Sequence, residues 1–506
     1  MRWICALLPA IMLPAAGFGA DTRVAEAVMH GDGASVRELL RQRADVNAAL
    51  PDGTTALHWA AQADDLETVE LLIAASANVK VKDRYGFTPL YFAATNGNAA
   101  VIRKLLDAGA DPNAADASGE TALMTATRSG NVDALKALLQ KGASVNAKDT
   151  VTQQTALMWA ARSNSAAAVQ LLVEYGAEIN ARTRTGKTPA ARPPGAGGGS
   201  HGVGIVRSGW PEQGFQPETP GGMTPLLYAS RDGRMDIARL LVAAKADVQQ
   251  ADVNGITPLL MAITNHHLDT ARFLLEQAAN PNAADWWGRA PLYAAIEIRN
   301  RDYGRNLEHD IDRPAALELI KMLLDRGANV NARTKEAPPI RRFVTPLGDL
   351  SWVDFTGQTP FLRAAMAGDL AVMRLLLDKG ADPNISTFAG TTALMAASGV
   401  NWMSDQTFTE SKETLMEAVQ LCLDKGADVN AKNSMGVTAV IGAANRGSDD
   451  ILEFLVKKGA RLDIRDKEGR SPLVWAEGVF LATNAPVAKP STMDLIKKLL
   501  VSEKAQ

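Results

Sequence analysis

A repeating interval is the feature that most constrains how this chain of 506 residues folds. Thr55, Thr88 and Thr121 lie 33 residues apart, and the interval recurs later between Leu226 and Leu259. A unit of this length is too short to bury its own apolar face, so neighbouring copies must pack on one another. The period therefore predicts one continuous stacked core in place of several compact domains.

Each copy contains the start and stop signals of two short helices. Thr88 is a helix-capping residue, and Pro89 occupies the first helical position, where its missing N–H costs nothing. Gly97–Asn98 interrupts the first helix, and a second helix with an apolar stripe follows. Gly109 then ends the second helix in the left-handed conformation. One copy thus predicts a helical hairpin followed by a turn.

These motifs resemble the ankyrin-repeat family across nearly everything after about residue 22. The matching segments are Thr-Ala-Leu-His at 55–58, Thr-Pro-Leu at 88–90, 224–226 and 257–259, and Gly-Ala-Asp/Asn-x-Asn-Ala at 327–332 and 426–431. The resemblance implies an all-α solenoid of about twelve helix hairpins with β-turn fingers. It also implies a scaffold that binds other proteins and carries no chemistry of its own.

The repeat array is interrupted at several places, which defines the predicted organisation. The segments are a signal peptide (1–19), an N-terminal capping repeat (20–51), ankyrin repeats (52–185), a Gly/Pro-rich finger insertion (186–222), repeats (223–335), a second finger insertion (336–356), and repeats with a C-terminal cap (357–506). Three long interhelix loops are also expected, at 299–314, 399–413 and 478–491, and a last helix over 493–500. The loop at 191–221 is either an arm that recognises a partner or a disordered insertion.

The first twenty residues have the pattern of a secretory signal peptide. Arg2 supplies the positive start, Ile4–Leu13 is apolar, and small residues follow. Cleavage after Gly19 places small residues at −3 and −1, whereas cleavage after Ala20 places Phe18 at −3, so Gly19 is favoured. The alternative is an uncleaved membrane anchor, which the short apolar length and two prolines disfavour. We therefore expect export to a bacterial periplasm or to the outside of the cell, with no membrane insertion after signal removal.

Charge and cysteine content exclude several classes of protein. The net charge is −3, from 53 basic and 56 acidic residues without long runs, so neither nucleic acid nor an anionic membrane is an expected partner. Cys5 leaves with the signal, and Cys422 remains as the single thiol of the mature chain. Its apolar neighbours predict a small core residue, and a reactive thiol is the alternative.

No catalytic, metal or cofactor site is predicted. The histidines form no metal-ligand spacing with cysteine or carboxylate; they are His30, His58, His201, His266, His267 and His309. Residues 195–200 are rich in glycine, but no Gly-Lys-Ser/Thr follows and no strand precedes them, so they do not form a phosphate loop. His266–His267 replaces the interhelix Gly-Asn pair, and His58 orders its turn. We accordingly expect no enzyme activity.

Two sets of residues are assigned structural roles. Four units lack glycine at the left-handed position that ends the second helix, and have Arg43, Ser76, Lys245 and Ala278 there. A recurring asparagine is expected to hydrogen-bond local backbone; its members are Asn47, Asn113, Asn146, Asn180, Asn331, Asn384 and Asn430. Asn384 also begins a glycosylation motif, but its place in this set argues against modification.

The candidate binding residues lie one per repeat on the expected inner, concave face. They follow the Thr-Pro-Leu-x motif, and the series is Trp59, Phe92, Thr125, Trp159, Tyr228, Met261, Ala294, Arg363, Ala396, Gly442 and Trp475. Four of the first six are aromatic in a chain with 5% aromatic residues, which predicts an apolar groove for a partner segment. The alternative is that the large side chains only fill space between finger and helix.

The finger tips complete the predicted site. Two fingers carry residue types that dominate binding energy: Arg84, Tyr85 and Phe87, and then Trp286, Trp287 and Arg289. We therefore predict a non-enzymatic scaffold that binds a partner protein or peptide through the concave groove and finger tips, with Met261 among the binding residues. The rival hypothesis is a structural or protective scaffold that organises an exported enzyme through the long interhelix loops. The sequence sets no oligomeric state.

Overall fold

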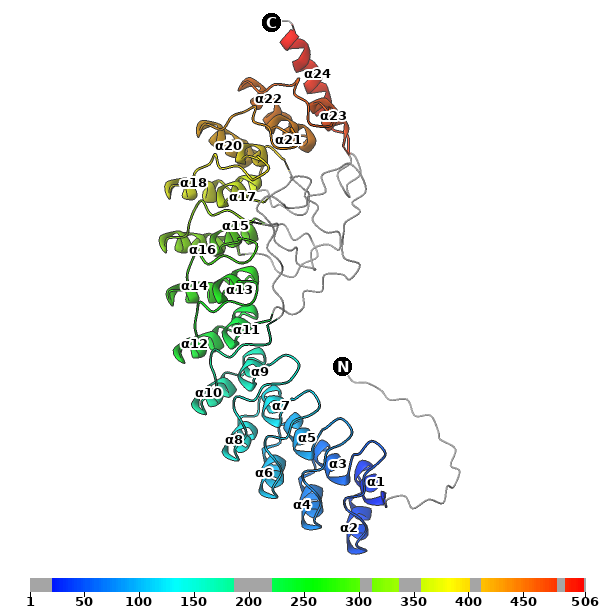
Figure 1. Cartoon of the computed structure of the whole chain (residues 1–506). Coiled ribbons are helices and arrows are strands. Elements are labelled where there is room, and N and C mark those ends of the chain that lie inside the picture. The colour runs from blue at the N-terminus through cyan, green and yellow to red at the C-terminus, as the bar shows by residue number, and fades with distance from the viewer. Residues whose placement is uncertain are drawn as a thin grey trace, which may run out of the picture. The chain divides into compact units, whose positions relative to one another are not determined.

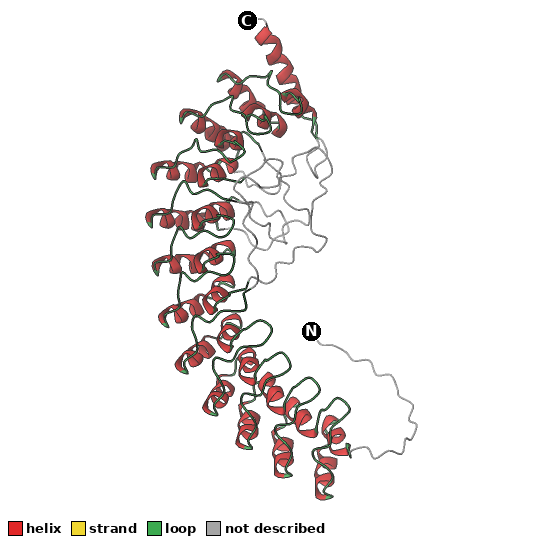
Figure 2. Cartoon of the chain, viewed as in Figure 1, coloured by secondary structure: helices red, strands yellow, loops and turns green. Residues whose placement is uncertain are grey.

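The computed structural model describes residues 21–185, 221–300, 312–335, 356–400, 411–479 and 487–504. These residues form 24 helices joined by turns, and within these ranges there is no strand, only one isolated antiparallel bridge between Ala115 and Thr121 (Figures 1 and 2). The helices pair into twelve hairpins in chain order, so the predicted all-α repeat fold is confirmed. None of the described helices is both long and apolar enough to cross a lipid bilayer.

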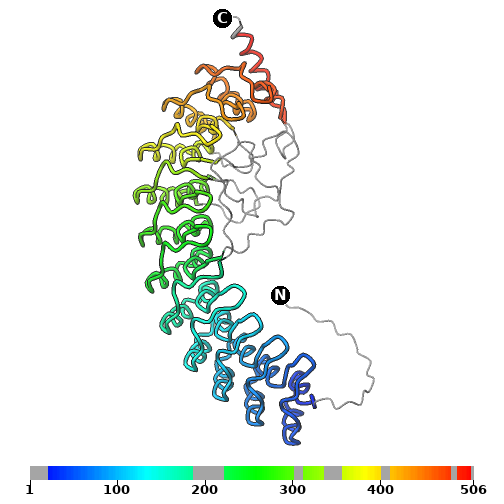
Figure 3. Tube along the Cα trace, in the orientation of Figure 1, coloured from blue at the N-terminus to red at the C-terminus, as the bar shows by residue number. Residues whose placement is uncertain are grey.

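The chain separates into two units, which are described one at a time. Unit 1 ends at Glu178 and contains five hairpins. Its helices are α1 (Arg23–Met29), α2 (Gly33–Arg41), α3 (Ala56–Gln62), α4 (Leu66–Ala74), α5 (Pro89–Asn96), α6 (Ala99–Asp107), α7 (Ala122–Ser129), α8 (Val132–Gln140), α9 (Ala156–Arg162) and α10 (Ala166–Glu174). Figure 3 lets the reader follow the chain through these hairpins.

Unit 2 begins at Ile179 and contains seven hairpins among its described residues. Its helices are α11 (Pro225–Arg231), α12 (Met235–Ala243), α13 (Pro258–Thr264), α14 (Leu268–Glu276), α15 (Pro291–Arg299), α16 (Arg313–Asp325), α17 (Pro360–Ala367), α18 (Leu370–Asp378), α19 (Ala393–Ala397), α20 (Lys412–Asp424), α21 (Ala439–Arg446), α22 (Asp449–Lys457), α23 (Pro472–Glu477) and α24 (Pro490–Lys504). The last helix begins three residues earlier than predicted, because Pro490 is compatible with its first turn.

The hairpin of α5 and α6 forms for the reasons that the sequence indicates. The Thr88 hydroxyl oxygen accepts a hydrogen bond of 3.2 Å from a backbone N–H in the first turn, and Pro89 is the first helical residue. Gly97 has φ +71° and ends α5, and the Asn98 side chain caps α6. Gly109 has φ +93° just after α6. Local capping chemistry therefore sets both ends of these two helices.

The core of each unit lies between the paired helices. The leucine of the Thr-Pro-Leu motif is at most 1% exposed in the hairpins of Leu57, Leu90, Leu123 and Leu157. The first helices of neighbouring hairpins pack side by side within a unit, as do the second helices. Each such buried leucine stabilises the stack by about 1.5–3 kcal/mol relative to an exposed one. Burial repeated hairpin after hairpin is what holds the array together.

Adjacent fingers are joined by one backbone hydrogen bond per repeat. In unit 1 the N–H of Arg84 donates to the carbonyl of Asp52 at 3.0 Å, and the N–H of Ala117 donates to the carbonyl of Tyr85 at 3.2 Å. In unit 2 the N–H of Trp286 donates to the carbonyl of Asn254 at 2.8 Å. These bonds align the finger tips in a row.

The recurring asparagines bond to backbone, but not to local backbone as predicted. The Asn113 amide nitrogen donates to the carbonyl of Gly142 at 3.0 Å, and its oxygen accepts the N–H of Ser144 at 2.7 Å. Both partners belong to the following repeat, so the side chain links one repeat of the stack to the next. Asn384 likewise donates its amide to the carbonyl of Lys425 at 3.1 Å.

The predicted left-handed residues are confirmed. Arg43, Ser76, Lys245 and Ala278 have φ of +55°, +67°, +72° and +61°. The interhelix prediction for His266 is also correct, because it has φ +66°, and the next residue is the N-cap of α14.

Two single-residue predictions agree with the structure. His58 Nδ1 accepts the N–H of Thr55 at 3.0 Å, and its Nε2 lies 3.1 Å from the carbonyl oxygen of Phe87 in the next repeat. Burial lowers the pKa of His58, so the neutral ring orders this turn. Cys422 is 1% exposed, and burial raises the pKa of its thiol to about 12, so it is a core residue.

Several predictions concern residues outside the described part of the chain. They are the signal peptide (1–19), most of the insertions at 186–222 and 336–356, and the central portions of the loops at 299–314, 399–413 and 478–491. The hypothesis that those loops form the contact surface therefore stays a prediction.

Candidate functional site

In unit 1 the predicted inner positions all fall at the fourth residue of the first helix of a hairpin. Trp59 on α3, Phe92 on α5 and Trp159 on α9 are half-buried, whereas Thr125 on α7 is 1% exposed. The Trp59 indole N–H donates to the Thr54 hydroxyl at 3.2 Å. Because α3, α5, α7 and α9 pack consecutively, these side chains occupy one side of unit 1.

The finger before α5 adds its predicted residues to this side. Tyr85 is 53% exposed and Arg84 is exposed, whereas Phe87 is half-buried. The Arg84 guanidinium carbon lies 4.7 Å from the centre of the Tyr85 ring. The Tyr85 ring centre is in turn 6.2 Å from that of Phe87. The Arg84 guanidinium also donates to the Tyr85 hydroxyl at 2.7 Å, so this finger presents a cation held against an aromatic side chain.

The finger and the helix share a cluster of aromatic rings. Phe87 stacks on Tyr91 with ring centres 4.4 Å apart and meets Phe92 edge-on at 5.8 Å. Phe92 also meets the His58 ring of the preceding repeat edge-on at 6.0 Å. Contacts of this kind fix the rings relative to one another, so the cluster is pre-organised.

The fourth hairpin links this cluster to Trp159 through polar side chains. The Thr125 hydroxyl donates to the Glu120 carboxylate at 2.9 Å, and Arg128 forms an ion pair with the same carboxylate at 2.8 Å. Burial raises the pKa of the neighbouring Tyr91 phenol, and the Glu120 charge adds to the effect. Tyr91 therefore stays neutral, and the polar link continues the surface across α7.

Two arginines lie over the Trp159 ring. The Arg128 guanidinium carbon is 5.0 Å and that of Arg162 is 5.4 Å from the centre of its ring. Arg162 also donates to the Gln154 side chain at 3.3 Å. The surface defined by all these residues is called the front face of unit 1; its members are Trp59, Arg84, Tyr85, Phe87, Tyr91, Phe92, Arg128, Trp159 and Arg162.

The predicted inner residues of unit 2 do not form an open groove. Tyr228 and Met261 are each 6% exposed. Arg231 lies over the Tyr228 ring at 4.9 Å and is held by Asp232 at 2.7 Å, and the Asn265 amide lies 3.4 Å from the Met261 sulfur. Both side chains are thus buried, so the prediction that they line an open groove was wrong.

The other inner residues of unit 2 are also buried. They are Ala294, Arg363, Ala396, Gly442 and Trp475. The Trp475 indole N–H donates to the Asp466 carboxylate at 2.9 Å, which explains why this large side chain packs inside.

The second predicted finger is split between surface and structural roles. Trp286 and Trp287 are half-buried and meet edge-on with ring centres 5.6 Å apart. Arg289 is instead engaged internally, with its guanidinium 3.0 Å from Asp285 and 3.9 Å from Glu297. Its predicted contact with a partner is therefore replaced by two ion pairs that brace the finger.

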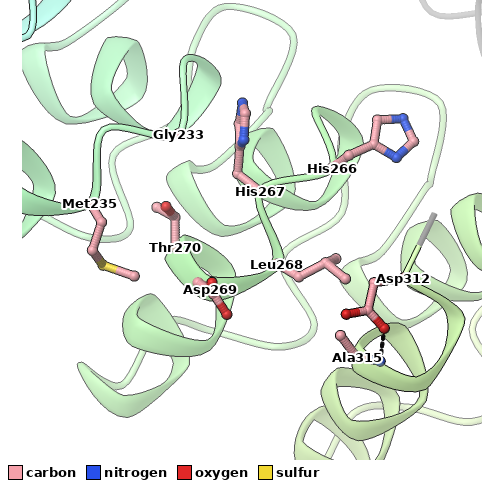
Figure 4. A pocket seen from close by; sticks show the side chains of 9 residues that line it. All are labelled: Gly233, Met235, His266, His267, Leu268, Asp269, Thr270, Asp312 and Ala315. Atoms are coloured by element: carbon pink, nitrogen blue, oxygen red, sulfur yellow. Dashed lines mark hydrogen bonds between the residues drawn. The ribbon is translucent and has the colours of Figure 1, made fainter. Parts of the chain in front are cut away.

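Unit 2 also contains a pocket that the sequence did not indicate. Its volume is about 320 Å³, and Figure 4 shows the side chains that line it: Gly233, Met235, His266, His267, Leu268, Asp269, Thr270, Asp312 and Ala315. His267 Nε2 lies 3.0 Å from the carbonyl oxygen of Arg231, and Asp312 caps α16 by accepting the N–H of Ala315 at 2.8 Å. In the described part of the chain, no three His, Cys, Asp or Glu side chains are grouped so as to hold a metal ion.

Sequence reasoning missed three members of the front face. Tyr91 lies one residue before an inner position. At the equivalent place, most other repeats have a buried residue such as Met124 or Met158. Arg128 and Arg162 each lie three residues after an inner position. This spacing places each arginine on the same helix face as the inner residue, so the sequence contained the signal that they belong to the front face.

Comparisons with known proteins agree with the repeat architecture. The family described as "Ankyrin repeats (3 copies)" matches residues 24–116, 114–183, 210–285, 252–334 and 410–478, and the family described as "Ankyrin repeat" matches residues 356–388. These matches cover more than half of the chain.

Two curated proteins are similar to part of the chain. Ankyrin repeat and KH domain-containing protein 1 of Homo sapiens is 30% identical over 155 residues, which is 31% of this chain and 4% of the human protein. Ankyrin repeat and KH domain-containing protein mask of Drosophila melanogaster is 30% identical over 156 residues, 31% of this chain and 2% of the fly protein. The chain thus spans a small fraction of the length of these relatives.

Proposed function

We propose that this chain, which belongs to the ankyrin-repeat family, is a non-enzymatic scaffold that binds an exposed segment of a partner protein on the front face of unit 1. Ankyrin repeats generally mediate protein–protein interaction. The observation that carries the proposal is the unbroken series of contacts from His58 through the aromatic cluster to Trp159, across four consecutive hairpins.

The residue types on the front face suit this function. Trp, Tyr and Arg dominate the energetics of most protein interfaces, because each combines a large apolar surface with a polar group. Trp59, Phe92 and Trp159 are half-buried, so their rings are held in place and still expose area that a partner can cover. Rings that are already ordered lose little conformational entropy on binding, which favours affinity.

We further propose that the chain is exported and acts in a bacterial periplasm or outside the cell. The support is the signal-peptide pattern of residues 1–19, with cleavage after Gly19 or Ala20. The intact mass of the protein purified from its native cells tests this proposal. A mass that includes the first nineteen residues would contradict cleavage.

The interaction is tested with the double variant Trp59→Ala/Trp159→Ala. Partners are cross-linked in the native cells, identified by mass spectrometry, and their recovery with wild type and variant is compared. We expect the variant to keep its helical circular dichroism and thermal midpoint within a few degrees, and to lose a specific partner by at least about tenfold.

Two further variants make the test specific. Tyr175→Ala removes an aromatic ring of unit 1 that is 40% exposed but lies after α10, away from the front face, and it should leave binding unchanged. Tyr228→Ala removes a buried ring of unit 2, and it should lower stability. If Trp59→Ala/Trp159→Ala behaves like Tyr228→Ala, the front-face tryptophans pack internally and the proposal is wrong.

A further inference from the structure

We propose that the inner face of unit 2 is a docking surface whose occupant is a segment of the same chain, residues 336–355. This face is defined by the inner residues of α13, α15, α17 and α19, which are Met261, Ala294, Arg363 and Ala396, and by the positions three residues after each of them. The proposal does not depend on the front face of unit 1.

The position three residues after an inner residue differs in burial between the two units. In unit 1 this position is exposed in four consecutive hairpins, at Gln62, Thr95, Arg128 and Arg162. In unit 2 the equivalent Thr264, Glu297 and Met366 are 8%, 8% and 6% exposed. Helix packing within the stack leaves this position open in unit 1, so the burial in unit 2 indicates an additional contact.

The burial is complete on four consecutive first helices and decreases on both sides of them. Every residue of α13, α15, α17 and α19 is buried. On the helices before and after this group, Arg231 of α11 and Arg446 of α21 are half-buried. The centre of the buried stretch therefore lies between α15 and α17, where the finger of residues 334–358 joins the stack.

Three buried polar side chains of these helices indicate what the occupant supplies. Neither amide atom of Asn300 has a hydrogen-bond partner within the described chain, and neither has Arg363 Nη1 or Ser398 Oγ. Arg363 is 7% exposed, and the other two residues are 0% exposed. Buried polar groups are rarely left unpaired, so the occupant is expected to bring backbone groups and a carboxylate for Arg363.

Residues 336–355 leave the stack and return to it at one finger in the middle of the buried stretch. The N–H of Thr334 donates to the carbonyl of Gln358 at 3.0 Å, and the N–H of Gly357 donates to the carbonyl of Thr334 at 2.9 Å. The Tyr293 hydroxyl of α15 donates to the Gln358 side chain at 2.5 Å. Both ends of the segment are therefore fixed beside α15 and α17.

The length of the segment matches the extent of the buried stretch. A chain that goes out and returns over twenty residues reaches about 33 Å, since an extended residue advances about 3.3 Å. Packed helices are separated by about 8–10 Å, so α13 and α19 lie within about 20 Å of the finger. The segment is long enough to contact all four helices.

The composition of the segment also favours it over the other insertions. Eight of the twenty residues are Ile, Leu, Val, Phe or Trp, whereas only five of the thirty-five residues at 186–220 are. Apolar side chains at this density gain free energy when a surface removes them from water. Asp349 and Asp354 provide carboxylates that complement the charge of Arg363.

At α21 a described residue of the chain already fills an inner position. Val400 follows α19 and is 0% exposed, and a Cβ added to Gly442 would lie 2.8 Å from Val400 Cγ2. The glycine therefore leaves room for a connecting residue of the preceding repeat. Occupation of the inner side by the chain itself has a precedent in the next repeat.

The test measures how fast a thiol on the inner face reacts with a soluble thiol reagent in the folded, full mature chain. Met366→Cys places the thiol on α17, and Cys422, the other thiol, is 1% exposed and reports whether the fold is intact. The labelled site is identified by peptide mass spectrometry. Replacing residues 336–355 by a Gly-Ser sequence of the same length should speed labelling at Met366→Cys by at least about tenfold and leave Cys422 unreactive.

Two controls make the test specific. The same Gly-Ser replacement of residues 186–220 should leave the Met366→Cys thiol protected. Arg162→Cys, at the equivalent exposed position of unit 1, should react fast with and without either replacement. A synthetic peptide of residues 336–355, added to the chain that lacks this segment, should restore protection, and a scrambled peptide should not.

Several outcomes would overturn the proposal. Fast labelling of Met366→Cys in the chain with its segment intact would show an open face. Unchanged slow labelling after the replacement would show that the helices bury the position by themselves. Protection that is lost on dilution, together with dissociation of a dimer in sedimentation, would assign the occupant to a second copy of the chain. If the replacement makes Cys422 reactive, Phe343→Ser/Trp352→Ser, which keeps the length and both ends of the segment, is judged by the same labelling rates.

Discussion

Replacing Asp252 by Asn is expected to make the stability of unit 2 less sensitive to pH. Asp252 is 5% exposed; one carboxylate oxygen accepts the N–H groups of Asn254 and Ile256, both at 2.8 Å, and the other has no hydrogen-bond partner. In the finger of the next repeat, the corresponding oxygen of Asp285 accepts the Arg289 side chain at 3.0 Å. Asp252 has Ile256 where that arginine would be, so its charge is buried without such a partner.

The magnitude follows from the pKa of Asp252. Burial raises the pKa of Asp252 from 3.8 to about 6. Two nearby charges act in opposite directions on this pKa: Asp285 raises it, and Arg182 lowers it by a smaller amount. Folding therefore favours the protonated carboxyl, and this stabilisation is fully present below about pH 4 and is lost as the pH rises through about 6. The shift of the pKa from 3.8 to about 6 corresponds to about 3 kcal/mol of folding stability. About 1.4 kcal/mol of this stability is lost between pH 5 and pH 8.

The Asn variant cannot ionise and keeps the oxygen that accepts both N–H groups. A natural precedent is Asn433, at the same place in a later finger, whose side-chain oxygen accepts the N–H groups of Met435 and Val437, both at 3.0 Å. The new amide N–H groups lower the stability of the variant by a similar amount at every pH. Relative to wild type, the free energy of unfolding of the variant should therefore increase by about 1.4 kcal/mol from pH 5 to pH 8.

The assay is urea unfolding of the full mature chain followed by circular dichroism at several pH values. Repeat arrays need not unfold in one step, so hydrogen exchange of the segment around Asn254 and Ile256 is measured in parallel as a local readout. Asp285→Asn is the control, because it separates Arg289 from its carboxylate and should lower stability at pH 8. A difference between Asp252→Asn and wild type that stays constant from pH 5 to pH 8 would refute the reasoning.

Three further predictions concern the fold. Lys245→Gly should stabilise the protein by about 1 kcal/mol and raise its melting temperature, because Lys245 has φ +72°. The reverse change, Gly142→Ala, should lower the melting temperature, because Gly142 has φ +87° and no atom lies within 4 Å of the added Cβ. An unchanged melting temperature in either variant would contradict the backbone explanation. Asn113→Ala should lower the free energy of unfolding by about 1–3 kcal/mol, measured by denaturant titration, because it removes two hydrogen bonds between repeats, with the carbonyl of Gly142 and the N–H of Ser144, each contributing about 0.5–1.5 kcal/mol. Cys422 should resist a thiol reagent in the native mature chain and react only on unfolding, so fast labelling of folded protein would show that it is accessible.

The sequence by itself determined the architecture, because the signals for a hairpin act within one repeat. Thr88, Pro89 and Gly109 set helix ends through their own backbone and hydroxyl chemistry, and the structure has them in those roles. The left-handed conformation of Lys245 was predictable for the same reason: its position relative to the end of α12 dictates φ whichever side chain it has.

Only the tertiary structure decided which side chains are open to a partner. The inner positions of Phe92 and Tyr228 are equivalent in sequence, yet Phe92 is half-buried and Tyr228 is 6% exposed under Arg231. Likewise, Arg128 reaches the ring of Trp159 in the next repeat, and Asn113 bonds the backbone of the next repeat. The partners of Arg128 and Asn113 are atoms of the next repeat, and a pattern read within one repeat contains no information about them.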